Sequence, residues 1–293
     1  MAELRSAVYT ASPALATRSP KFFAEPSWSP ISCTLVYSSK EAVLVDTPLT
    51  IKQTEDLIEW IKKIAPHQKL SYIYITHGHG DHFFGLPLLL KSFPEAVPIA
   101  TKGTVAHMED SIAEPLFTEF WEKRFPDGQI ARPFVLAKAL EGLEPTFKLE
   151  DRWEFQVVDC GHSDTYSTTA LWVPDLKLAI CGDVVYGQVH QMLFFANTKA
   201  KRDEWIRAIE KIEALGPHYV VPGHRQPEEI DGAWHLSATR KYIEDFGRVL
   251  ESDPKDADEL FATMMGLYPE RYNPNALKQS AMGAFMVAKD LRT

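Results

Sequence analysis

Cysteines and long apolar segments are scarce in this sequence. The 293 residues contain three cysteines, Cys33, Cys160 and Cys181, which lie far apart and form no C-x-x-C pair. This spacing excludes a disulfide-stapled scaffold and the common zinc-finger patterns, and it favours a reducing compartment. No apolar run has the length of a membrane span, and the amino-terminal segment lacks the apolar core of a signal peptide. We therefore expect a cytoplasmic protein that makes no membrane contact.

Positive charge is also sparse. The 31 Lys and Arg residues are outnumbered by 40 Asp and Glu residues, which gives a formal net charge of −9, and no run of Lys or Arg is longer than a pair. Such a chain has no electrostatic attraction to a phosphate backbone, so we expect no nucleic-acid partner. Hydrophobic residues at 45% and charged residues at 24% match ordinary folded proteins and argue against disorder.

The periodicity of apolar residues predicts a mixed α/β fold. Segments 31–39 and 41–48 are rich in β-formers and flank a short polar turn, so we expect a hairpin. Residues 51–64 have helical spacing, with Thr50 as the N-cap and Pro66 beyond the end. The other strands are expected at 69–76, 97–101, 147–161, 168–182 and 218–224, and the other helices at 84–94 and 198–216.

Two regions depart from this alternation. Residues from about 102 to 144 are rich in aromatic side chains and broken by prolines and a glycine, which predicts a helical insertion. Residues from about 231 to 293 predict a helical carboxyl-terminal extension. No repeat or linker divides the chain, so we expect one domain over residues 1–293. The aromatic insertion and the apolar loop 191–197 fit the wall of a pocket for a small, partly aromatic substrate, and they fit core packing or a homodimer interface equally well.

The segment Y-I-T-H-G-H-G-D-H-F-F-G is the most informative in the chain. Three histidines and an aspartate within six residues arise by chance on the order of once in a thousand such chains. His77 and His79 alternate along an extended segment and point the same way, while Asp81 and His82 point elsewhere. The turn therefore presents two nitrogens to one metal ion, and an oxygen with a nitrogen to a second. This mixture of donors suits zinc first and is compatible with iron or manganese.

Three further candidate ligands stand at the ends of predicted strands. They are His162, Asp183 and His224, and each follows a glycine, which allows close approach of the backbone. The same device used three times predicts that these side chains complete the metal site.

Together, the motifs T-H-G-H-G-D-H (76–82), G-H-S (161–163), G-D (182–183) and P-G-H (222–224) carry a family resemblance. From about residue 31 to residue 224 the chain resembles metallo-β-lactamase-fold hydrolases. The resemblance implies a four-layer αββα sandwich, in which two mixed sheets pack face to face with helices outside and metals at one edge. Two stretches depart from the commoner sequence pattern of the family: "SDTYS" after His162 and "FFG" after His82.

The resemblance also implies roles for the ligand set and an expectation of two Zn²⁺ ions per chain. Asp183 would bridge the ions, and a metal-bound hydroxide would attack a carbonyl carbon. Asp81 would orient this nucleophile and pass its proton to the leaving group. The remaining assignments are His77, His79 and His162 to the first metal, and Asp81, His82 and His224 to the second.

Four residues outside the ligand set are weaker candidates. Tyr186 stands three residues after Asp183, as in lactonases of this fold, where the tyrosine is thought to contact the substrate carbonyl; it is equally well interpreted as a half-buried aromatic. Asp46 is either a carboxylate that fixes a histidine ring or a turn cap. His190 would contact substrate or support Asp183, or be structural. Phe83 would line the pocket or begin a buried helix face.

The leading hypothesis is a hydrolase that opens a lactone or lactam of a small natural product or xenobiotic, with Tyr186 as its supporting feature. One alternative is a glyoxalase II-like thioesterase, which would need basic residues such as Arg271 and Lys278 to hold an anionic tail. Another is an iron-bound oxidoreductase resembling persulfide dioxygenases. A secreted β-lactamase is disfavoured, because the chain shows no signal peptide and keeps Asp183, which those enzymes lack.

Overall fold

The structure is a computed structural model, and it describes residues 3–17, 27–142 and 144–286. The two ends of the expected 1–293 domain and residue 143 of the expected insertion lie outside these residues. The strands are β1 (Arg5–Thr10), β2 (Ala14–Leu15), β3 (Ser27–Trp28), β4 (Ser32–Tyr37), β5 (Glu41–Val45), β6 (Lys69–Tyr74), β7 (Val97–Thr101), β8 (Lys138–Leu140), β9 (Thr146–Leu149), β10 (Trp153–His162), β11 (Tyr166–Val173), β12 (Leu178–Ile180) and β13 (Tyr219–Val221). The α-helices are α1 (Ile51–Ile64), α2 (Gly80–Phe83), α3 (Leu86–Ser92), α4 (Lys102–Ile112), α5 (Lys199–Ala214), α6 (Trp234–Glu251), α7 (Ala257–Leu267) and α8 (Pro274–Phe285).

The amino-terminal half builds a six-stranded sheet of order β1-β4-β5-β6-β7-β8. The predicted hairpin is confirmed as the antiparallel pair β4 and β5, and β5 to β8 run parallel. Parallel neighbours need crossover connections, which α1 supplies between β5 and β6 and α3 supplies between β6 and β7. The predicted cap of α1 is also confirmed, since Thr50 and Gln53 form a reciprocal capping box.

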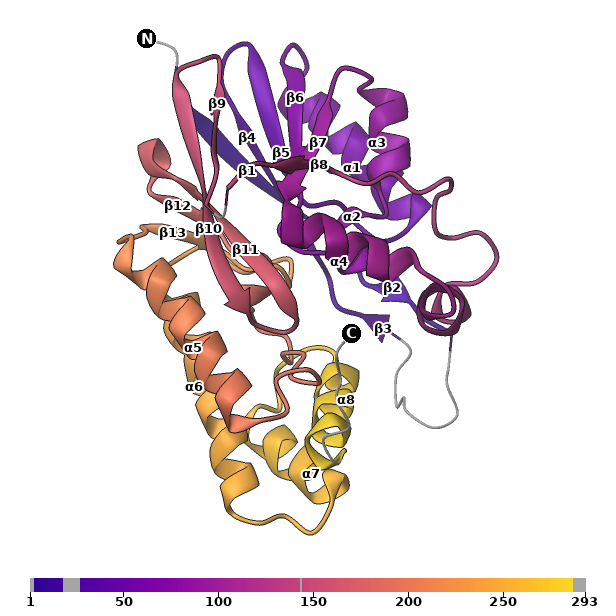
Figure 1. Cartoon of the computed structure of the whole chain (residues 1–293), viewed down its shortest axis with the longest axis vertical. Coiled ribbons are helices and arrows are strands. Elements are labelled where there is room, and N and C mark those ends of the chain that lie inside the picture. The colour runs from indigo at the N-terminus through magenta and orange to yellow at the C-terminus, as the bar shows by residue number, and fades with distance from the viewer. Residues whose placement is uncertain (1–2, 18–26, 143, 287–293) are drawn as a thin grey trace.

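The second half builds a five-stranded sheet of order β13-β12-β11-β10-β9. Its strands are antiparallel except for β12 and β13, which run parallel and are connected by a crossover that contains α5. A third, two-stranded sheet pairs β2 with β3. In Figure 1 the two large sheets lie side by side, with α1 and α3 on the outer side of one and α5 and α6 on the outer side of the other.

Three apolar cores correspond to this layering. The core between the sheets combines residues of both, and it includes Val43, Tyr74, Phe155, Leu171 and Val221. One outer core lies between the first sheet and α1 with α3, and the other lies between the second sheet and α5 with α6. The predicted four-layer αββα sandwich is therefore confirmed. Among the described residues, no helix combines the length and apolarity needed to cross a bilayer.

The region from 102 to 144 is less helical than predicted. It begins with α4 and continues with a π-helical turn, Phe117–Glu122, but the chain then becomes irregular and adds β8 to the edge of the first sheet. Pro126 and Pro133 interrupt the helical pattern, because proline lacks an amide donor and restricts its neighbour. A three-residue edge strand shows too little alternation to be recognised from sequence. Beyond residue 231, the predicted helical extension consists of α6, α7 and α8 in the described residues.

The two sheets meet at one edge through backbone contacts between distant segments. The amide of Ser32 donates to the carbonyl of Gly223 at 2.8 Å, and the amide of Thr169 donates to the carbonyl of Thr76 at 3.0 Å. The first bond joins the start of β4 to the segment after β13, and the second joins the segment after β6 to β11. All the residues described next lie at this edge.

Candidate metal centre

The histidine turn leaves the end of β6 and runs directly into α2. His79 is the N-cap of that short helix, so the predicted strand-to-helix turn is where these residues lie. A Cβ on Gly78 would overlap the backbone of His107 and Met108, which explains the glycine at this position. The carbonyl of Gly78 accepts a 2.6 Å hydrogen bond from Ser111, and its amide donates to His107 Nδ1 at 3.3 Å. Helix α4 therefore holds the turn in place.

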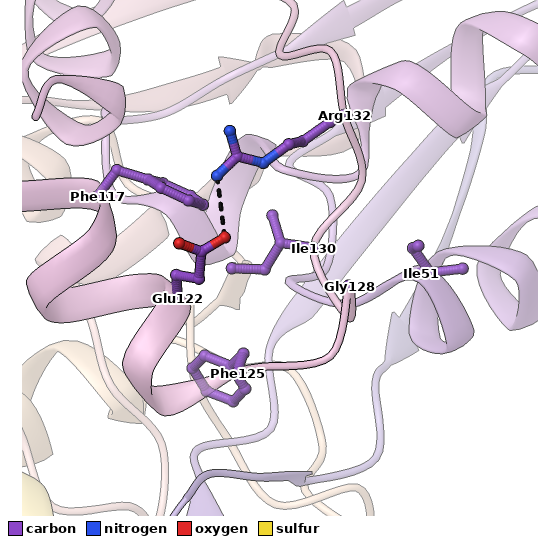
Figure 2. Close-up of a pocket in the computed structure, with 7 residues that line it drawn as sticks. All are labelled: Ile51, Phe117, Glu122, Phe125, Gly128, Ile130 and Arg132. Carbon is purple, nitrogen blue, oxygen red and sulfur yellow. Dashed lines mark hydrogen bonds and ion pairs between the residues drawn. The ribbon is translucent and has the colours of Figure 1, made fainter.

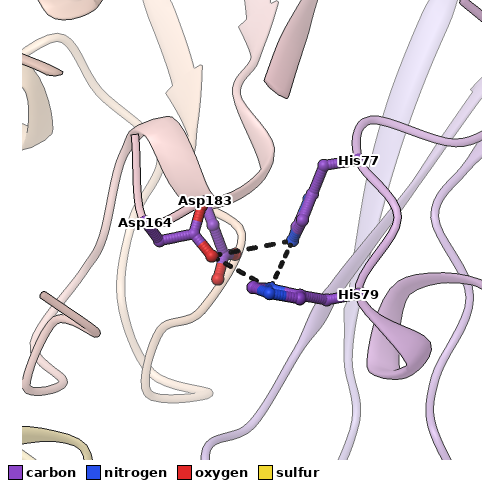
Figure 3. Close-up of side chains that lie close together, drawn as sticks. All are labelled: His77, His79, Asp164 and Asp183. Atoms are coloured by element: carbon purple, nitrogen blue, oxygen red, sulfur yellow. Dashed lines mark hydrogen bonds and ion pairs between the residues drawn. The ribbon is translucent and has the colours of Figure 1, made fainter. Parts of the chain in front are cut away.

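One group of potential donors consists of His77, His79, Asp164 and Asp183 (Figure 3). His77 Nε2 lies 3.2 Å from His79 Nδ1, and Asp164 Oδ2 lies 3.0 Å from His79 Nδ1 and 3.9 Å from His77 Nε2. His79 is the partly open member, with 21% of its side chain exposed, while Asp164 is fully buried. We call these four residues the first donor group.

A second donor group consists of Asp81, His82 and His224, and all three are buried. His224 Nε2 lies 3.3 Å from Asp81 Oδ2. The other oxygen contacts are made by Asp183, whose Oδ1 lies 3.2 Å from His82 Nε2 and whose Oδ2 lies 3.4 Å from His224 Nε2. Asp183 thus belongs to the first group and touches the second, so one carboxylate connects both.

Glycines allow Asp183 to reach this position. It lies in a 3₁₀ turn, Gly182–Val184, directly after β12. Gly182 has a φ of +48°, and a Cβ there would overlap Thr76, while a Cβ on Gly223 would overlap Asp183 Oδ1. Both positions therefore require glycine for close approach of the three segments.

Hydrogen bonds to the far side of each ring determine which imidazole nitrogen faces the centre. His82 Nδ1 donates to Asp46 Oδ2 at 2.9 Å, and His224 Nδ1 donates to the carbonyl of Pro30 at 2.9 Å. Asp46 also accepts from the amide and hydroxyl of Thr76, at 2.8 and 2.7 Å. Each bond leaves Nε2 of the ring directed at the donor groups. These are the contacts expected of Asp46 if it fixes a histidine ring.

Charge coupling across the centre is strong. Burial alone would lower the pKa of His224, but the carboxylates of Asp183 and Asp81 raise it to about 10. The pKa of His82 is raised well above its usual value, because burial lowers it but Asp183, Asp46 and Asp81 together outweigh that effect. The pKa of Asp183 is held well below its ordinary range despite burial, mainly by His224 and His82. Positive charge is therefore stabilised in the space between these acids.

The residues present fit divalent metal ions. His82 Nε2, Asp183 Oδ1 and Asp164 Oδ2 are buried and have no hydrogen-bond partner among the described residues, although they lie close to other donors. Buried polar atoms are normally satisfied, so atoms that converge without bonding one another are typical of ligands to an ion. Imidazole and carboxylate donors suit zinc, iron and manganese.

The structure does not bring His162 to either donor group. Register shifts interrupt the pairing of β10 with β11 on both sides of Gly161, which has a φ of +67°. Such a bulge re-aims the following side chains. Burial and then the Lys201 cation lower the pKa of His162, and both Lys201 and Glu204 of α5 influence it. His162 therefore has charged neighbours on α5 and belongs to neither donor group, and Asp164 is found in the first group where His162 was expected.

Three of the four weaker candidates, Tyr186, His190 and Phe83, are buried. The hydroxyl of Tyr186 donates to Asp183 Oδ2 at 2.6 Å and its side chain is buried, so it contacts the bridging acid and is not a half-buried aromatic. His190 is fully buried and bonds the Tyr242 hydroxyl through Nδ1 at 2.8 Å, outside both donor groups. Phe83 is buried in the apolar core beneath α1, which agrees with its interpretation as the start of a buried helix face. The His190 and Phe83 side chains are both buried, and neither belongs to a donor group.

Sequence reasoning missed two residues beside the cluster. The indole of Trp28 donates to Asp81 Oδ2 at 2.6 Å, although 53 positions separate the two. The ring of His107 lies 4.3 Å from that of Tyr166 and 5.1 Å from that of His79. No local pattern marks either residue. By contrast, the unusual "SDTYS" stretch was the available signal for Asp164.

A half-open pocket of about 270 Å³ lies between the aromatic insertion and the start of α1. Figure 2 shows that Phe117, Phe125, Ile130 and Ile51 line it and that an ion pair, Glu122 to Arg132 at 3.2 Å, lies at its side. None of the seven lining residues belongs to a donor group. The aromatic cluster nevertheless reaches the centre, because Phe125 packs edge-on against Trp28, which contacts Asp81.

The two basic residues named for the thioesterase alternative are already engaged. Arg271 is buried and donates to the carbonyls of Gly187 and Val189, at 3.1 and 2.8 Å. Lys278 pairs with Asp258 across α7 and α8. Neither cation is placed beside the donor groups in the described part of the chain.

Comparison with known proteins identifies relatives of this chain. The model of the metallo-beta-lactamase superfamily matches residues 26–224. A metallo-beta-lactamase type 2 from Bacteroides fragilis is 24% identical over 193 residues, 65% of this chain and 67% of that protein. An atrochrysone carboxyl ACP thioesterase from Cryptosporiopsis sp. is 24% identical over 190 residues, which cover 65% of this chain but 47% of the thioesterase.

Solved structures show the same fold. The crystal structure of DIM-1 metallo-beta-lactamase exposed to ceftazidime superimposes with a TM-score of 0.58 at 21% identity, and the match covers 83% of this chain and 97% of that one.

Proposed function

Because this chain belongs to the metallo-β-lactamase superfamily, we propose that it is a dinuclear metal-dependent hydrolase that opens the ring of a small lactone or lactam. The observation that carries the proposal is the position of Asp183, which joins two groups of imidazole and carboxylate donors. Two metal sites that share one carboxylate lie close enough to act on a single carbonyl group.

The donor chemistry supports two divalent ions, with zinc as the first choice and iron or manganese as alternatives. Two ions bound there would supply a hydroxide nucleophile at neutral pH and would polarise the substrate carbonyl. The chain's own residues do the positioning. Asp81 Oδ2 is held by the Trp28 indole, so its carboxylate has a fixed orientation beside the reacting groups, which suits the proton-transfer role proposed for it.

Tyr186 has a different part in this proposal from the one its sequence position indicated. Its hydroxyl donates to Asp183 Oδ2, and it would have to break that bond to reach a substrate oxygen. We assign Tyr186 to the positioning of Asp183, where a phenol bound to a carboxylate fixes the orientation of the bridging group.

The surroundings favour a small neutral ring. The exposed edge of the first donor group is His79, with the rings of His107 and Tyr166 nearby, and the aromatic cluster of Trp28 borders Asp81. No Lys or Arg forms an ion pair with either donor group within the described ranges. A natural product or xenobiotic of this kind, met in the cytoplasm, is the proposed substrate class.

The test combines metal analysis with a substrate panel. Purified protein is loaded separately with Zn²⁺, Mn²⁺ and Fe²⁺, and its metal content is measured by elemental analysis. Turnover is then followed for an aromatic lactone, an aliphatic lactone, a γ-lactam and a glutathione thioester. We expect about two ions per chain and ring opening. Asp183→Asn should lower kcat/KM at least ~10³-fold, because it removes the shared anionic ligand.

Lys278→Ala serves as the matched control, since it removes a charge far from the donor groups and should leave ring opening unchanged. Failure to open any ring, with metal bound, would refute the lactone or lactam assignment. Oxygen-dependent turnover with iron would favour the oxidoreductase alternative.

A thioesterase is the second candidate, and the match to the ACP thioesterase from Cryptosporiopsis sp. favours it. Cleavage of a thioester uses the same attack on a carbonyl carbon. The engagement of Arg271 and Lys278 elsewhere argues against an anionic tail bound by these residues. Turnover of an N-acetylcysteamine thioester without ring opening would establish this candidate over the first.

A further inference from the structure

The first donor group departs from the ligand pattern of the family at its third position. We propose that Asp164, in place of His162, is the third protein ligand of the first metal ion. This half of the centre is then a site of two imidazoles and two carboxylates, His77, His79, Asp164 and Asp183. The inference rests on the proposed dinuclear hydrolase and specifies how this chain holds one of its metals.

Distances within the group carry the inference. His77 Nε2, His79 Nδ1 and Asp164 Oδ2 form a triangle with sides of 3.0, 3.2 and 3.9 Å. Ligands bound at about 2.1 Å around a tetrahedral ion are separated by about 3.4 Å. The triangle has this size, so the three atoms can bind one ion without rearrangement of the backbone.

The orientation of Asp164 also matches that of a ligand. Ser163 donates to its Oδ1 at 2.9 Å, which leaves Oδ2 directed at the two histidines. Although Oδ2 lies 3.0 Å from His79 Nδ1, it has no properly aligned hydrogen-bond donor in the described structure. A fully buried carboxylate oxygen near an imidazole but not bonded to it is explained when both bind the same ion.

His162 is not placed to do this. The strand pairing is irregular on both sides of Gly161, where a Cβ would lie 3.2 Å from Glu204 Oε1 of α5, and His162 belongs to neither donor group. Its Nδ1 is buried without a hydrogen-bond partner, but that atom belongs to neither donor group. The irregular backbone at Gly161 and the turn that follows it are therefore decisive: His162 lies outside the first donor group, and Asp164, two residues later, lies within it.

Replacing an imidazole by a carboxylate changes the character of the site. Carboxylates favour harder ions such as Mn²⁺, whereas imidazole suits zinc and iron. We expect the first half of the centre to accept Mn²⁺ as well as Zn²⁺, with Asp164 required for both.

The decisive experiment compares two variants. Asp164→Asn, His162→Gln and the unchanged chain are loaded with Zn²⁺ alone or with Mn²⁺ alone, passed over a desalting column and analysed for metal per chain. Asp164→Asn should retain about one ion and His162→Gln about two. Folding is checked for each by circular dichroism. Retention of two ions by Asp164→Asn, or loss of one by His162→Gln, would overturn the proposal.

A second measurement needs no folded Asp164 variant. In the unchanged chain labelled with ¹⁵N-histidine, imidazole nitrogen spectra are recorded before and after addition of Zn²⁺, and His162→Gln identifies the His162 signals. Four rings, those of His77, His79, His82 and His224, should take on shifts of metal-bound imidazole while His162 does not. A metal-bound shift for His162 would refute the inference.

These readouts do not depend on turnover. A chain that binds two ions through Asp164 but opens no ring would refute the proposed function and leave this ligand assignment intact. A chain that opens rings and loses a metal with His162→Gln would do the reverse.

Discussion

The second donor group is held more firmly than the first. Each of its donors is hydrogen-bonded by another segment: Asp81 Oδ2 by the Trp28 indole, His82 Nδ1 by Asp46 and His224 Nδ1 by the Pro30 carbonyl. In the first group His77, Asp164 and Asp183 are bonded by Thr76, Ser163 and Tyr186, but His79 is partly exposed and no described hydrogen bond fixes the far side of its ring. Rigid, buried donors lose less entropy on binding. From this difference we predict that the second half binds a metal ion more tightly than the first.

Asp46→Asn is expected to cause the largest loss of metal affinity at the second donor group. Asparagine tolerates the φ of +61° at this position but places an NH₂ group where His82 and Thr76 donate. Loss of the partner behind a metal-binding histidine commonly weakens affinity about 10- to 100-fold. Competition with a chromogenic chelator should show this loss mainly for the tighter ion.

Asp245→Asn is the control for that variant. Asp245 is also a buried carboxylate, but it lies on α6, pairs with Lys241 and Tyr268, and belongs to neither donor group. It should leave metal affinity unchanged. Equal metal affinity in Asp46→Asn and the unchanged chain would contradict the idea that hydrogen bonds to its donors make the second group bind metal more tightly.

His190 lies outside both donor groups, so its pKa can be compared with those of His82 and His224. Burial, with a smaller contribution from Arg271, lowers its pKa to about 4, the opposite direction from His82 and His224, which face carboxylates. The unfolded chain therefore binds more protons than the fold between about pH 6.5 and 4, and stability falls as the pH drops through that window. Between pH 7 and 5 the loss from this group is about 2 kcal/mol.

Urea unfolding at several pH values measures the effect. A His190→Gln variant should show a shallower decline over the same window, since glutamine does not titrate. An unchanged slope in that variant would show that other groups account for the pH dependence.

The smallest effect is expected from Trp28→Phe. Phenylalanine keeps the aromatic contacts with Phe125 and Trp121 but removes the N–H that donates to Asp81. A hydrogen bond to a charged group contributes on the order of 1.5 kcal/mol, so metal affinity at the second half should fall about tenfold.

Trp121→Phe is the matched control, because it changes a ring of the same cluster that makes no described hydrogen bond to a donor residue. If both variants weaken metal binding equally, packing and not the indole N–H positions Asp81.

Much of the centre could be predicted from the sequence, because its main motif is local. The segment 76–82 supplies four donors within one turn, and Asp183 and His224 follow glycines at strand ends. The structure brings these six residues together, and their binding of metal stays a prediction. The placement of His162 could not be predicted, since a one-residue irregularity in the pairing of β10 decides which side chain faces the centre.

Contacts over long sequence distances were beyond local reasoning. Trp28 reaches Asp81 from the two-stranded sheet, and nothing in the residues around either one indicates the other. The fold was easier, because alternating strands and amphipathic helices carry their own periodicity. Its missed parts, such as β2 and β8, are two- and three-residue strands that are fixed by their neighbours and not by their own pattern.

The bond between His224 and the carbonyl of Pro30 joins positions that are 194 residues apart in the chain. Closing so long a stretch of chain costs more conformational entropy than forming a local contact does. An ion held by His77 and His79 from one sheet and by Asp183 from the other would act as a crosslink between them. Metal availability would then govern how long the folded protein survives as well as whether it turns over, since any ligand that binds only the native state raises its stability.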